Sequence, residues 1–569
     1  MFLPTTRREM DKLGWDHADI ILVTGDSYID SPFIGIALIG KVLQRAGYRV
    51  GIVAQPETQS GRDISRLGEP RLFWGVSAGS IDSMVANYTA LKKKRRTDDY
   101  TPGGINNRRP DRAAIFYSNL IRRYFKNTRP IVLGGLEASL RRIAHYDFWS
   151  DRVRASILFD AKADYLLYGM AEKAAVELAD ALRTGSDVGL IRGLCYIAKE
   201  SDDAGTRNGF LELPSYETVS RDKLAFIEMF HAFYQNCDPV TAKGLLQKHG
   251  TRYLVQNPPA DYPTQAELDS FYALEFERAQ HPYYQKQGEV RALETIRFSV
   301  STHRGCYGEC NFCAISMHEG SRIQWRSPQS ILAEATQLTR RPDFKGYILD
   351  VGGPTANMYG IECAKKASRG NCPKKRCLYP NVCPSLKADH RRQLDLLKRI
   401  RHINGIKKVF VASGIRYDLL LNDRKHGPEY LLELIKHHVS GQLKVAPEHS
   451  EDTVLKLMGK PGTTSLVTFR ELFYRMSGAA GQDQYLTYYL IAAHPGCSED
   501  DMRQLKRFTE HTLRISPEQV QIFTPTPSTY SSLMYYTELD PFTGQPLFVE
   551  KDPVRKARQK NIAIRKRNG

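Results

Sequence analysis

Residues 299–313 have the sequence Ser299-Val-Ser-Thr-His-Arg-Gly-Cys306-Tyr-Gly-Glu-Cys310-Asn-Phe-Cys313. The apolar run over residues 295–301 is typical of a strand, so the three cysteines lie on the loop that follows it. Thiolates are soft ligands that suit zinc or iron–sulfur clusters. Closed zinc sites and electron-transfer clusters normally have four protein ligands, whereas three thiolates would leave one iron of a cubane open to a small molecule. The segment therefore predicts a metal site at a strand end.

Downstream of this loop, apolar runs alternate with helical stretches. Ser327 is placed to cap a helix over residues 327–338, with Pro328 at its first position. Six such alternations predict a (β/α)6 TIM-like barrel, complete or partial, in which chemistry collects at the carboxyl ends of the strands. The six apolar runs are residues 295–301, 346–351, 408–412, 442–446, 485–492 and 519–523.

A second α/β unit is predicted upstream. An apolar run over residues 20–24 precedes a helical pattern that stops at Gly47, and residues 48–53 are apolar again. A strand, a helix stopped by glycine and another strand form a βαβ unit. Similar short runs follow, so residues 1–195 predict a Rossmann-like, open and mostly parallel sheet.

The remaining segments complete the expected domain plan of this 569-residue chain, which exceeds what one hydrophobic core usually supports. Residues 196–293, helical and then rich in proline, are expected to connect the two units. The barrel is expected over residues 294–535, with a cysteine-rich insertion at 360–385. Residues 536–569 are expected to form a basic tail.

The composition favours a cytosolic protein with a polyanionic partner. The amino-terminal residues are charged and no apolar stretch approaches the length of a membrane helix, so no membrane association is expected. The ten cysteines would stay reduced there, which favours metal chemistry over disulfides. The net charge is +18, with basic residues concentrated in residues 91–130, including Lys92-Lys93-Lys94-Arg95-Arg96, and in the last twenty residues. RNA would suit this charge, although solvated surface faces would produce the same pattern.

The spacing Cys-x3-Cys-x2-Cys, with Phe312 before the third cysteine, resembles the signature of radical S-adenosylmethionine (SAM) enzymes. The resemblance extends over nearly the whole chain to the YgiQ-like family of radical SAM proteins. Leu274-Glu275-Phe276 departs from the Leu-Pro-Phe expected there, which affects no catalytic residue. The similar segments are Glu294-Thr-Ile-Arg-Phe-Ser-Val, Asp350-Val-Gly-Gly-Pro-Thr-Ala-Asn-Met-Tyr-Gly360, Ser413-Gly-Ile-Arg-Tyr-Asp418, Val445-Ala-Pro-Glu-His449 and Phe523-Thr-Pro-Thr-Pro527.

The resemblance implies that Cys306, Cys310 and Cys313 hold a [4Fe–4S] cluster whose open iron binds SAM. An electron from a reductant such as flavodoxin or ferredoxin would then cleave SAM into methionine and a 5′-deoxyadenosyl radical. The family leaves the substrate undefined, and the basic surface favours RNA. The alternative is a non-catalytic iron–sulfur or zinc protein that binds nucleic acid.

Matching strand ends to the superfamily gives expected SAM contacts. The resemblance implies that Gly352-Gly353-Pro354, after the second strand, present a backbone edge to the SAM amino group. It implies carboxylate or ribose contacts for Ser413 and Arg416, after the third strand, and for Glu448, after the fourth. An arginine could pair with the SAM carboxylate through two hydrogen bonds. Catalytic residues stay unassigned, since the histidines near the strand ends are better explained as hydrogen-bonded structural residues than as proton carriers: His303, His318, His449 and His494.

The amino-terminal domain resembles the cobalamin-binding domains of other radical SAM enzymes. Their lower-ligand motif is Asp-x-His-x-x-Gly. This chain has Asp26-Ser-Tyr28-Ile-Asp-Ser31 after its first strand, which lacks both the histidine and the glycine. The domain is therefore expected to have a cobalamin-binding fold without cobalamin.

A second cysteine group lies in the insertion: Cys363, Cys372, Cys377 and Cys383. The insertion has few apolar residues with which to fold, and a metal can stabilise such a loop. Six Lys or Arg and no acid lie between the first and last of these cysteines, which would stabilise thiolates. We expect a second metal site, and its ligands suit either zinc or a second iron–sulfur cluster.

Overall fold

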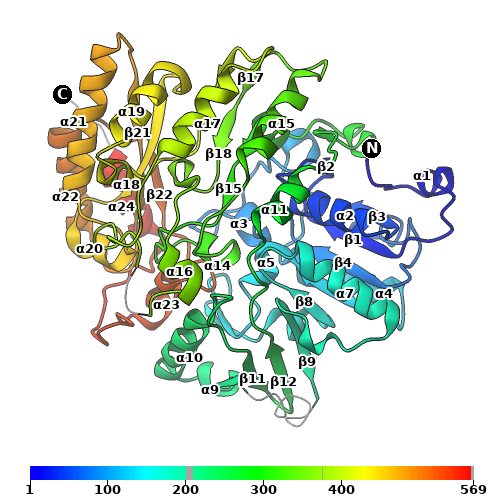
Figure 1. The fold of residues 1–569 in the computed structure, drawn as a ribbon. Helices are drawn as coiled ribbons and strands as arrows, with labels where there is room; N and C mark the ends of the chain where they lie inside the picture. The colour runs from blue at the N-terminus through cyan, green and yellow to red at the C-terminus, as the bar shows by residue number, and fades with distance from the viewer. Residues whose placement is uncertain (200–208, 374–375, 565–569) are drawn as a thin grey trace. The chain divides into compact units, whose positions relative to one another are not determined.

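The computed structural model describes residues 1–199, 209–373 and 376–564, which form two compact units (Figure 1). The first unit comprises Met1–Tyr262 and Ser270–Arg297, and the second comprises Pro263–Asp269 and Phe298–Gly569. Within the described ranges, no helix combines the length and the apolar character needed to span a bilayer.

A nine-stranded sheet forms the centre of the first unit, in the order β10-β11-β12-β9-β8-β5-β4-β1-β3. Strand β1 pairs in parallel with β3 and β4, and β5 and β8 continue the parallel part. This arrangement confirms the predicted open, mostly parallel sheet. The strands are β1 (Ile20–Thr24), β3 (Val50–Ala54), β4 (Phe73–Ser77), β5 (Ile131–Gly134), β8 (Tyr165–Leu167), β9 (Leu194–Ala198), β10 (Leu211–Leu213), β11 (Leu245–His249) and β12 (Arg252–Gln256).

Helix α2 (Gly35–Arg45) shows how the sequence produces the helices that pack on this sheet. Its apolar residues recur at helical spacing, and the buried Leu43 packs in one core with Ile20 and Leu22 of β1. The helix ends where Gly47 adopts a positive φ of 92°, a conformation that glycine reaches without steric cost. Helix α7 (Glu172–Thr184) adds side chains to the same core.

Residues 196–293 differ from the expected connection, because they contribute strands β10, β11 and β12 to the sheet. Strands β11 and β12 form an antiparallel hairpin around Gly250, and β12 pairs with β9 (Figure 1). Helix α13 (Ala292–Ile296) also occupies the start of the run expected as the first barrel strand. That strand, β14, is restricted to Ser299–Ser301.

The second unit contains parallel strands that follow one another along the chain. Strand β14 pairs with β18, β17 pairs with β19, and β20, β21 and β22 form a sheet, all in parallel. Hydrogen bonds from Val351 N to Phe410 O and from Phe410 N to Ile348 O join the second pair to the first. This confirms the predicted partial barrel. The strands are β14, β17 (Tyr347–Ile348), β18 (Asp350–Gly352), β19 (Lys408–Val409), β20 (Gln442–Glu448), β21 (Tyr485–Ala492) and β22 (Gln519–Ile522).

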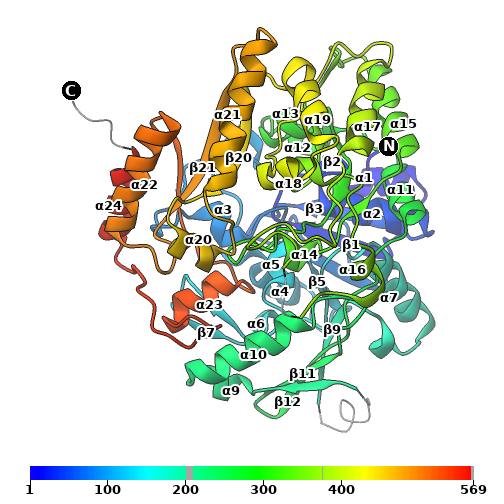
Figure 2. The ribbon, with the colours of Figure 1, turned by 60° about the vertical axis from the view of Figure 1, so that its left-hand side comes forward.

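Helices cover the outside of this barrel and share one core with its strands. Ser327 caps α15 (Pro328–Thr339) through a hydrogen bond from Ser330 N at 3.1 Å, as the sequence predicted. Helix α21 (Thr464–Ala479) lies along β20 and β21 (Figure 2), where Phe469 and Phe473 are fully buried in the core. Helix α17 (Arg391–Arg401) buries its leucines in the same core.

The expected basic tail contains helix α24 (Pro553–Ile564), which packs on the barrel. Gln559 is fully buried, accepts a hydrogen bond from Ala493 N at 2.9 Å and donates one to Cys497 O at 3.0 Å. Ala563 lies in a core cluster with Leu490 of β21. Residues 565–569, also expected in the tail, lie outside the described residues.

Candidate functional site

The cysteine loop extends from a short hairpin at the end of β14. Strand β15 (His303–Arg304) pairs antiparallel with β16 (Gln324–Trp325), which encloses residues 305–323. Gly305 has a φ of 82°, and a Cβ there would lie 2.2 Å from Arg322 O, so only glycine fits this turn. Hydrogen bonds from Gly305 N to Glu319 Oε2 and from Cys306 N to Gly320 O fold the loop back on itself.

The three thiols of this loop lie among few polar partners. Cys306 Sγ lies 3.5 Å from Thr355 Oγ1 and accepts a hydrogen bond from Gly308 N at 3.3 Å. Cys310 Sγ lies 3.9 Å from Arg416 Nη1. Burial raises the pKa of the Cys306 and Cys313 thiols, so thiolates here require a cation beside them.

The donor chemistry of these three thiols suits an iron–sulfur cluster, because thiolates are the usual protein ligands of such clusters. In the described part of the chain, the one group of three ligand atoms that all lie within 4.8 Å of one another does not include these cysteines. Zinc, with Zn–S bonds of about 2.3 Å, would hold its sulfurs roughly 3.8 Å apart. The three sulfurs are therefore not gathered as closely as a single zinc ion requires.

The Gly352-Gly353-Pro354 turn follows β18 and packs against His303. A Cβ on Gly353 would lie 2.7 Å from both the imidazole and the backbone oxygen of His303. The buried imidazole is fixed by Thr302 Oγ1 at 2.8 Å and by Thr355 O at 3.1 Å. Burial lowers the pKa of His303 to about 4. His303 therefore positions this turn and is neutral at pH 7.

The side chains of Ser413 and Arg416 are each held by an aspartate. The Ser413 hydroxyl donates to Asp350, whose other oxygen accepts from Ser413 N at 3.2 Å. Arg416 donates from Nε and Nη2 to the two oxygens of Asp418, at 2.8 and 2.6 Å. This pairing leaves Nη1, the nitrogen that faces Cys310, without a bond to Asp418.

Glu448 ends strand β20 in a strained conformation. Its φ is 72°, and the register of β20 against β21 shifts between Val445 and Glu448. The carboxylate is buried and lies 3.7 Å from Lys460 Nζ. Burial raises the pKa of Glu448 despite this lysine. Strain of this kind is concentrated at functional sites.

Two other histidines near the strand ends are buried and hydrogen-bonded. His449 Nδ1 accepts from Glu451 N at 3.1 Å, and His494 contacts Pro495 O and Ser531 Oγ at 2.8 and 2.7 Å. Burial lowers the pKa of His449 to about 4 and that of His494 to about 3. His318 lies half-buried at the end of α14 (Ile315–His318).

The residues that support this site were not found from the sequence. Asn357 accepts from Arg416 N at 2.7 Å and donates to Arg416 O at 3.0 Å. Asp350, Thr355 and Asn357 lie in the quoted segment 350–360, and Asp418 closes the segment that begins at Ser413. Their position within the family-like segments could have marked these four residues as part of the site. Lys460 lies outside those segments, so the sequence offered no such signal for it.

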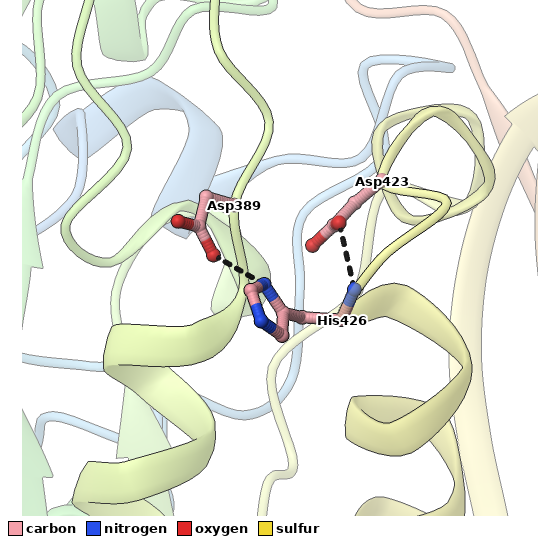
Figure 3. Close-up of side chains that lie close together, drawn as sticks. All are labelled: Asp389, Asp423 and His426. Atoms are coloured by element: carbon pink, nitrogen blue, oxygen red, sulfur yellow. Dashed lines mark hydrogen bonds and ion pairs between the residues drawn. The ribbon is translucent and has the colours of Figure 1, made fainter.

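The group with closely spaced ligand atoms consists of Asp389, Asp423 and His426 (Figure 3). His426 Nδ1 lies 2.9 Å from Asp389 Oδ1, and His426 N donates to Asp423 at 2.9 Å. Asp423 Oδ2 also accepts from the backbone N of His390 at 2.7 Å and lies 2.9 Å from its ring Nδ1. These hydrogen bonds account for the group, and we assign no metal to it.

In the first unit, the strand order reverses between β1 and β4, where open α/β sheets bind ligands. Asp26 follows β1 and pairs with Arg109 at 2.8 Å, and Arg109 also pairs with Asp98 at 3.1 Å. All three side chains are buried. The Tyr28 hydroxyl, where the cobalamin motif has histidine, accepts from Leu3 N and donates to Asp30. This edge is occupied by the chain's own ion pairs and offers cobalt no imidazole within Asp26–Ser31.

Comparison with known proteins identifies the family. A model of the radical SAM N-terminal domain matches residues 2–299, and a model of the radical SAM superfamily matches residues 300–509. A UPF0313 protein of Fusobacterium nucleatum subsp. nucleatum is 57% identical, over all of this chain and 99% of that protein. A UPF0313 protein of Thermotoga maritima is 48% identical over similar shares, 100% and 99%. The chain belongs to the UPF0313 family of radical SAM proteins.

Two solved structures share the fold of this UPF0313 protein. The radical SAM methyltransferase TsrM from Kitasatospora setae, with cobalamin and a [4Fe–4S] cluster bound, has a TM-score of 0.52 at 14% identity, over 91% of this chain and 74% of that one. The cobalamin-dependent SAM radical enzyme OxsB, with aqua-cobalamin bound, has a TM-score of 0.50 at 12% identity, over 93% and 57%.

Membership confirms the predicted resemblance and identifies this UPF0313 protein as a radical SAM enzyme, with a [4Fe–4S] cluster and SAM as its cofactors. The non-catalytic alternative is set aside.

Proposed function

We propose that Cys306, Cys310 and Cys313 hold the [4Fe–4S] cluster of this UPF0313 protein and that the enzyme cleaves SAM reductively. The observation that carries the proposal is the arrangement of three thiols on one loop at the end of β14, with Arg416 Nη1 3.9 Å from Cys310 Sγ. When bound, such a cluster supplies one electron through an open iron, and SAM is divided into methionine and a 5′-deoxyadenosyl radical. A flavodoxin or ferredoxin is the proposed electron source.

The surrounding residues have distinct proposed roles toward SAM. The backbone of Gly352, Gly353 and Pro354 presents hydrogen-bonding groups to the SAM amino group, and Arg416 Nη1 donates to its carboxylate. Ser413 acts indirectly, because its hydroxyl is bonded to Asp350. Glu448, buried beside Lys460, accepts from the ribose hydroxyls.

RNA is the proposed substrate class. The side chains of residues 92–96 are all basic and exposed, which suits a phosphate backbone. Absence of retention on immobilised RNA, even at low ionic strength, would contradict this substrate class and leave the SAM chemistry untouched.

The SAM chemistry is tested with protein reconstituted anaerobically with iron and sulfide. Dithionite and SAM should yield 5′-deoxyadenosine, and Cys→Ala at any of the three positions should abolish the product and most cluster absorbance. Cys195→Ala, at a buried cysteine of strand β9, is the matched control and should keep full activity. Cleavage of SAM by the triple variant would refute the proposal.

A further inference from the structure

The four cysteines of the insertion line a single cavity in the second unit. The cavity has a volume of about 60 Å³, and Lys366 and Arg376 also line it. Cys363 and Cys377 are buried, and Cys372 and Cys383 are half-buried. Cysteines separated by up to twenty residues in the sequence thus converge on one space.

Local structure holds the cysteines around this cavity. Cys363 precedes helix α16 (Ala364–Arg369), and a bridge between Glu362 and Lys387 closes the insertion at its base. Cys383 N donates to Cys377 O at 2.8 Å. The surrounding core is small and consists of Ile361, Leu378, Leu386 and a few neighbours. A core of this size leaves much of the stabilisation to a bound group.

No three of the four sulfurs are gathered as closely as a zinc ion requires. No three ligand atoms of this group lie within 4.8 Å of one another in the described residues, as also holds for Cys306, Cys310 and Cys313. Zinc would bring its four sulfurs to roughly 3.8 Å. A cavity bounded by four separated thiols fits a cubane.

Two cations, the buried Lys366 and the half-buried Arg376, line the cavity and would balance the negative charge of a bound cluster. Lys366 is 3% exposed, and its Nζ lies 3.9 Å from Cys377 Sγ and 3.3 Å from Glu309 Oε2. A buried ammonium requires anionic partners, and a cluster with four thiolates carries net negative charge. Arg376 Nη1 donates to Glu309 O at 2.8 Å, close to the same cavity.

The insertion is bonded to the loop that carries the first three cysteines. Glu309, the partner of Lys366 and Arg376, lies between Cys306 and Cys310 in the sequence. The ring of Tyr307 is fully buried in the same core as Cys363 and Cys377, and its hydroxyl donates to Ile361 O at 3.3 Å. Ser321 donates to Asn371 at 2.8 Å, next to Cys372.

We propose that Cys363, Cys372, Cys377 and Cys383 bind a second [4Fe–4S] cluster, coordinated entirely by protein and packed against the loop of the first. The proposal deepens the proposed function, since it adds a redox centre beside the site of SAM cleavage. A cluster with four thiolate ligands has no open iron, so SAM does not bind to it.

The test counts metal in two complementary variants. After anaerobic reconstitution, the triple Cys→Ala variant at 306, 310 and 313 should hold about four irons and four sulfides per chain, compared with about eight of each in the wild type. When reduced, its electron paramagnetic resonance spectrum should not change on addition of SAM. Cys363→Ala combined with Cys377→Ala should hold about four irons, and its spectrum should change with SAM.

The outcomes separate this proposal from the proposed function. One zinc and no iron in the triple variant would overturn the assignment of a cluster. If the triple variant held neither zinc nor iron, the metal site itself would be refuted. A SAM-insensitive spectrum in the double variant would refute the proposed function alone. Cys383→Ser, a milder change at a half-buried position, tests the same site if the double variant misfolds. It should also lose the second cluster. Cys195→Ala is the matched control, with about eight irons expected.

Discussion

At the scale of single residues, Gly352 and Gly353 are adjacent but packed differently. A Cβ on Gly353 would lie 2.7 Å from the backbone oxygen of His303, which cannot move independently of β15. A Cβ on Gly352 would have its nearest neighbour at 3.5 Å, an ordinary contact. A side chain at Gly353 would therefore collide with the protein, whereas one at Gly352 would not.

We predict that Gly353→Ala lowers the free energy of unfolding by about 1–3 kcal/mol, the usual cost of overpacking. Gly352→Ala should change it by less than about 0.5 kcal/mol. Urea unfolding of the two reconstituted variants, followed by fluorescence, measures the difference. Equal stability of the two variants would contradict the packing described for His303.

Candidate ligands are easier to predict from the sequence than the partners of the site residues. Cysteine spacing predicts Cys306, Cys310 and Cys313 as ligands, because residues on one loop are local in sequence. The partners of Ser413 and Glu448 are Asp350 and Lys460, on other elements. Such pairs form through the fold, so no local pattern reveals them. Asp418 lies only two residues after Arg416, and its pairing with the Arg416 guanidinium was not predicted either.

At the scale of elements, the side chain of Gln559 joins α24 to the barrel through two buried hydrogen bonds. We predict that Gln559→Ala lowers the free energy of unfolding by about 1–3 kcal/mol, because Ala493 N and Cys497 O would lose their buried partner. Arg558→Ala, at a neighbouring exposed side chain that pairs with Glu499, should cost less than about 0.5 kcal/mol. Thermal unfolding of the two variants measures the difference in stability. Equal losses of stability would show that the buried hydrogen bonds of Gln559 contribute little to holding α24 on the barrel.

Elements with clear periodicity were predicted from the sequence, and those with mixed polarity were not. Helix α15 and strand β21 follow ordinary patterns of capping and of apolar residues. Strands β11 and β12 contain Lys248 and Arg252 at their exposed turn, which obscures them as strands. Helix α24 was concealed by its composition, because its buried residues are Lys556, Gln559 and Ala563, of which only Ala563 is apolar.

At the scale of the whole molecule, the two units have the folds of a ligand-binding sheet and a catalytic barrel. The barrel has polar and cysteine side chains at its strand ends. The sheet of the first unit, by contrast, has the buried pairs Asp26–Arg109 and Asp98–Arg109 at its point of strand reversal. Buried pairs of this kind are costly to break, because removal of one partner leaves an isolated charge.

We therefore predict that the protein does not retain cobalamin, although TsrM and OxsB, which share its fold, have cobalamin bound. A ligand at the β1 edge would have to separate Arg109 from Asp26, and Tyr28 replaces the histidine of the motif. The reconstituted enzyme is incubated with hydroxocobalamin, desalted and examined by absorbance, with TsrM treated in parallel as the positive control. We expect less than about a tenth of an equivalent on this chain, because loss of the buried ion pairs opposes binding. Retention of about one equivalent would show that the sheet accommodates cobalamin without an imidazole. Loss of that binding in Tyr28→Phe would then place the cofactor at β1.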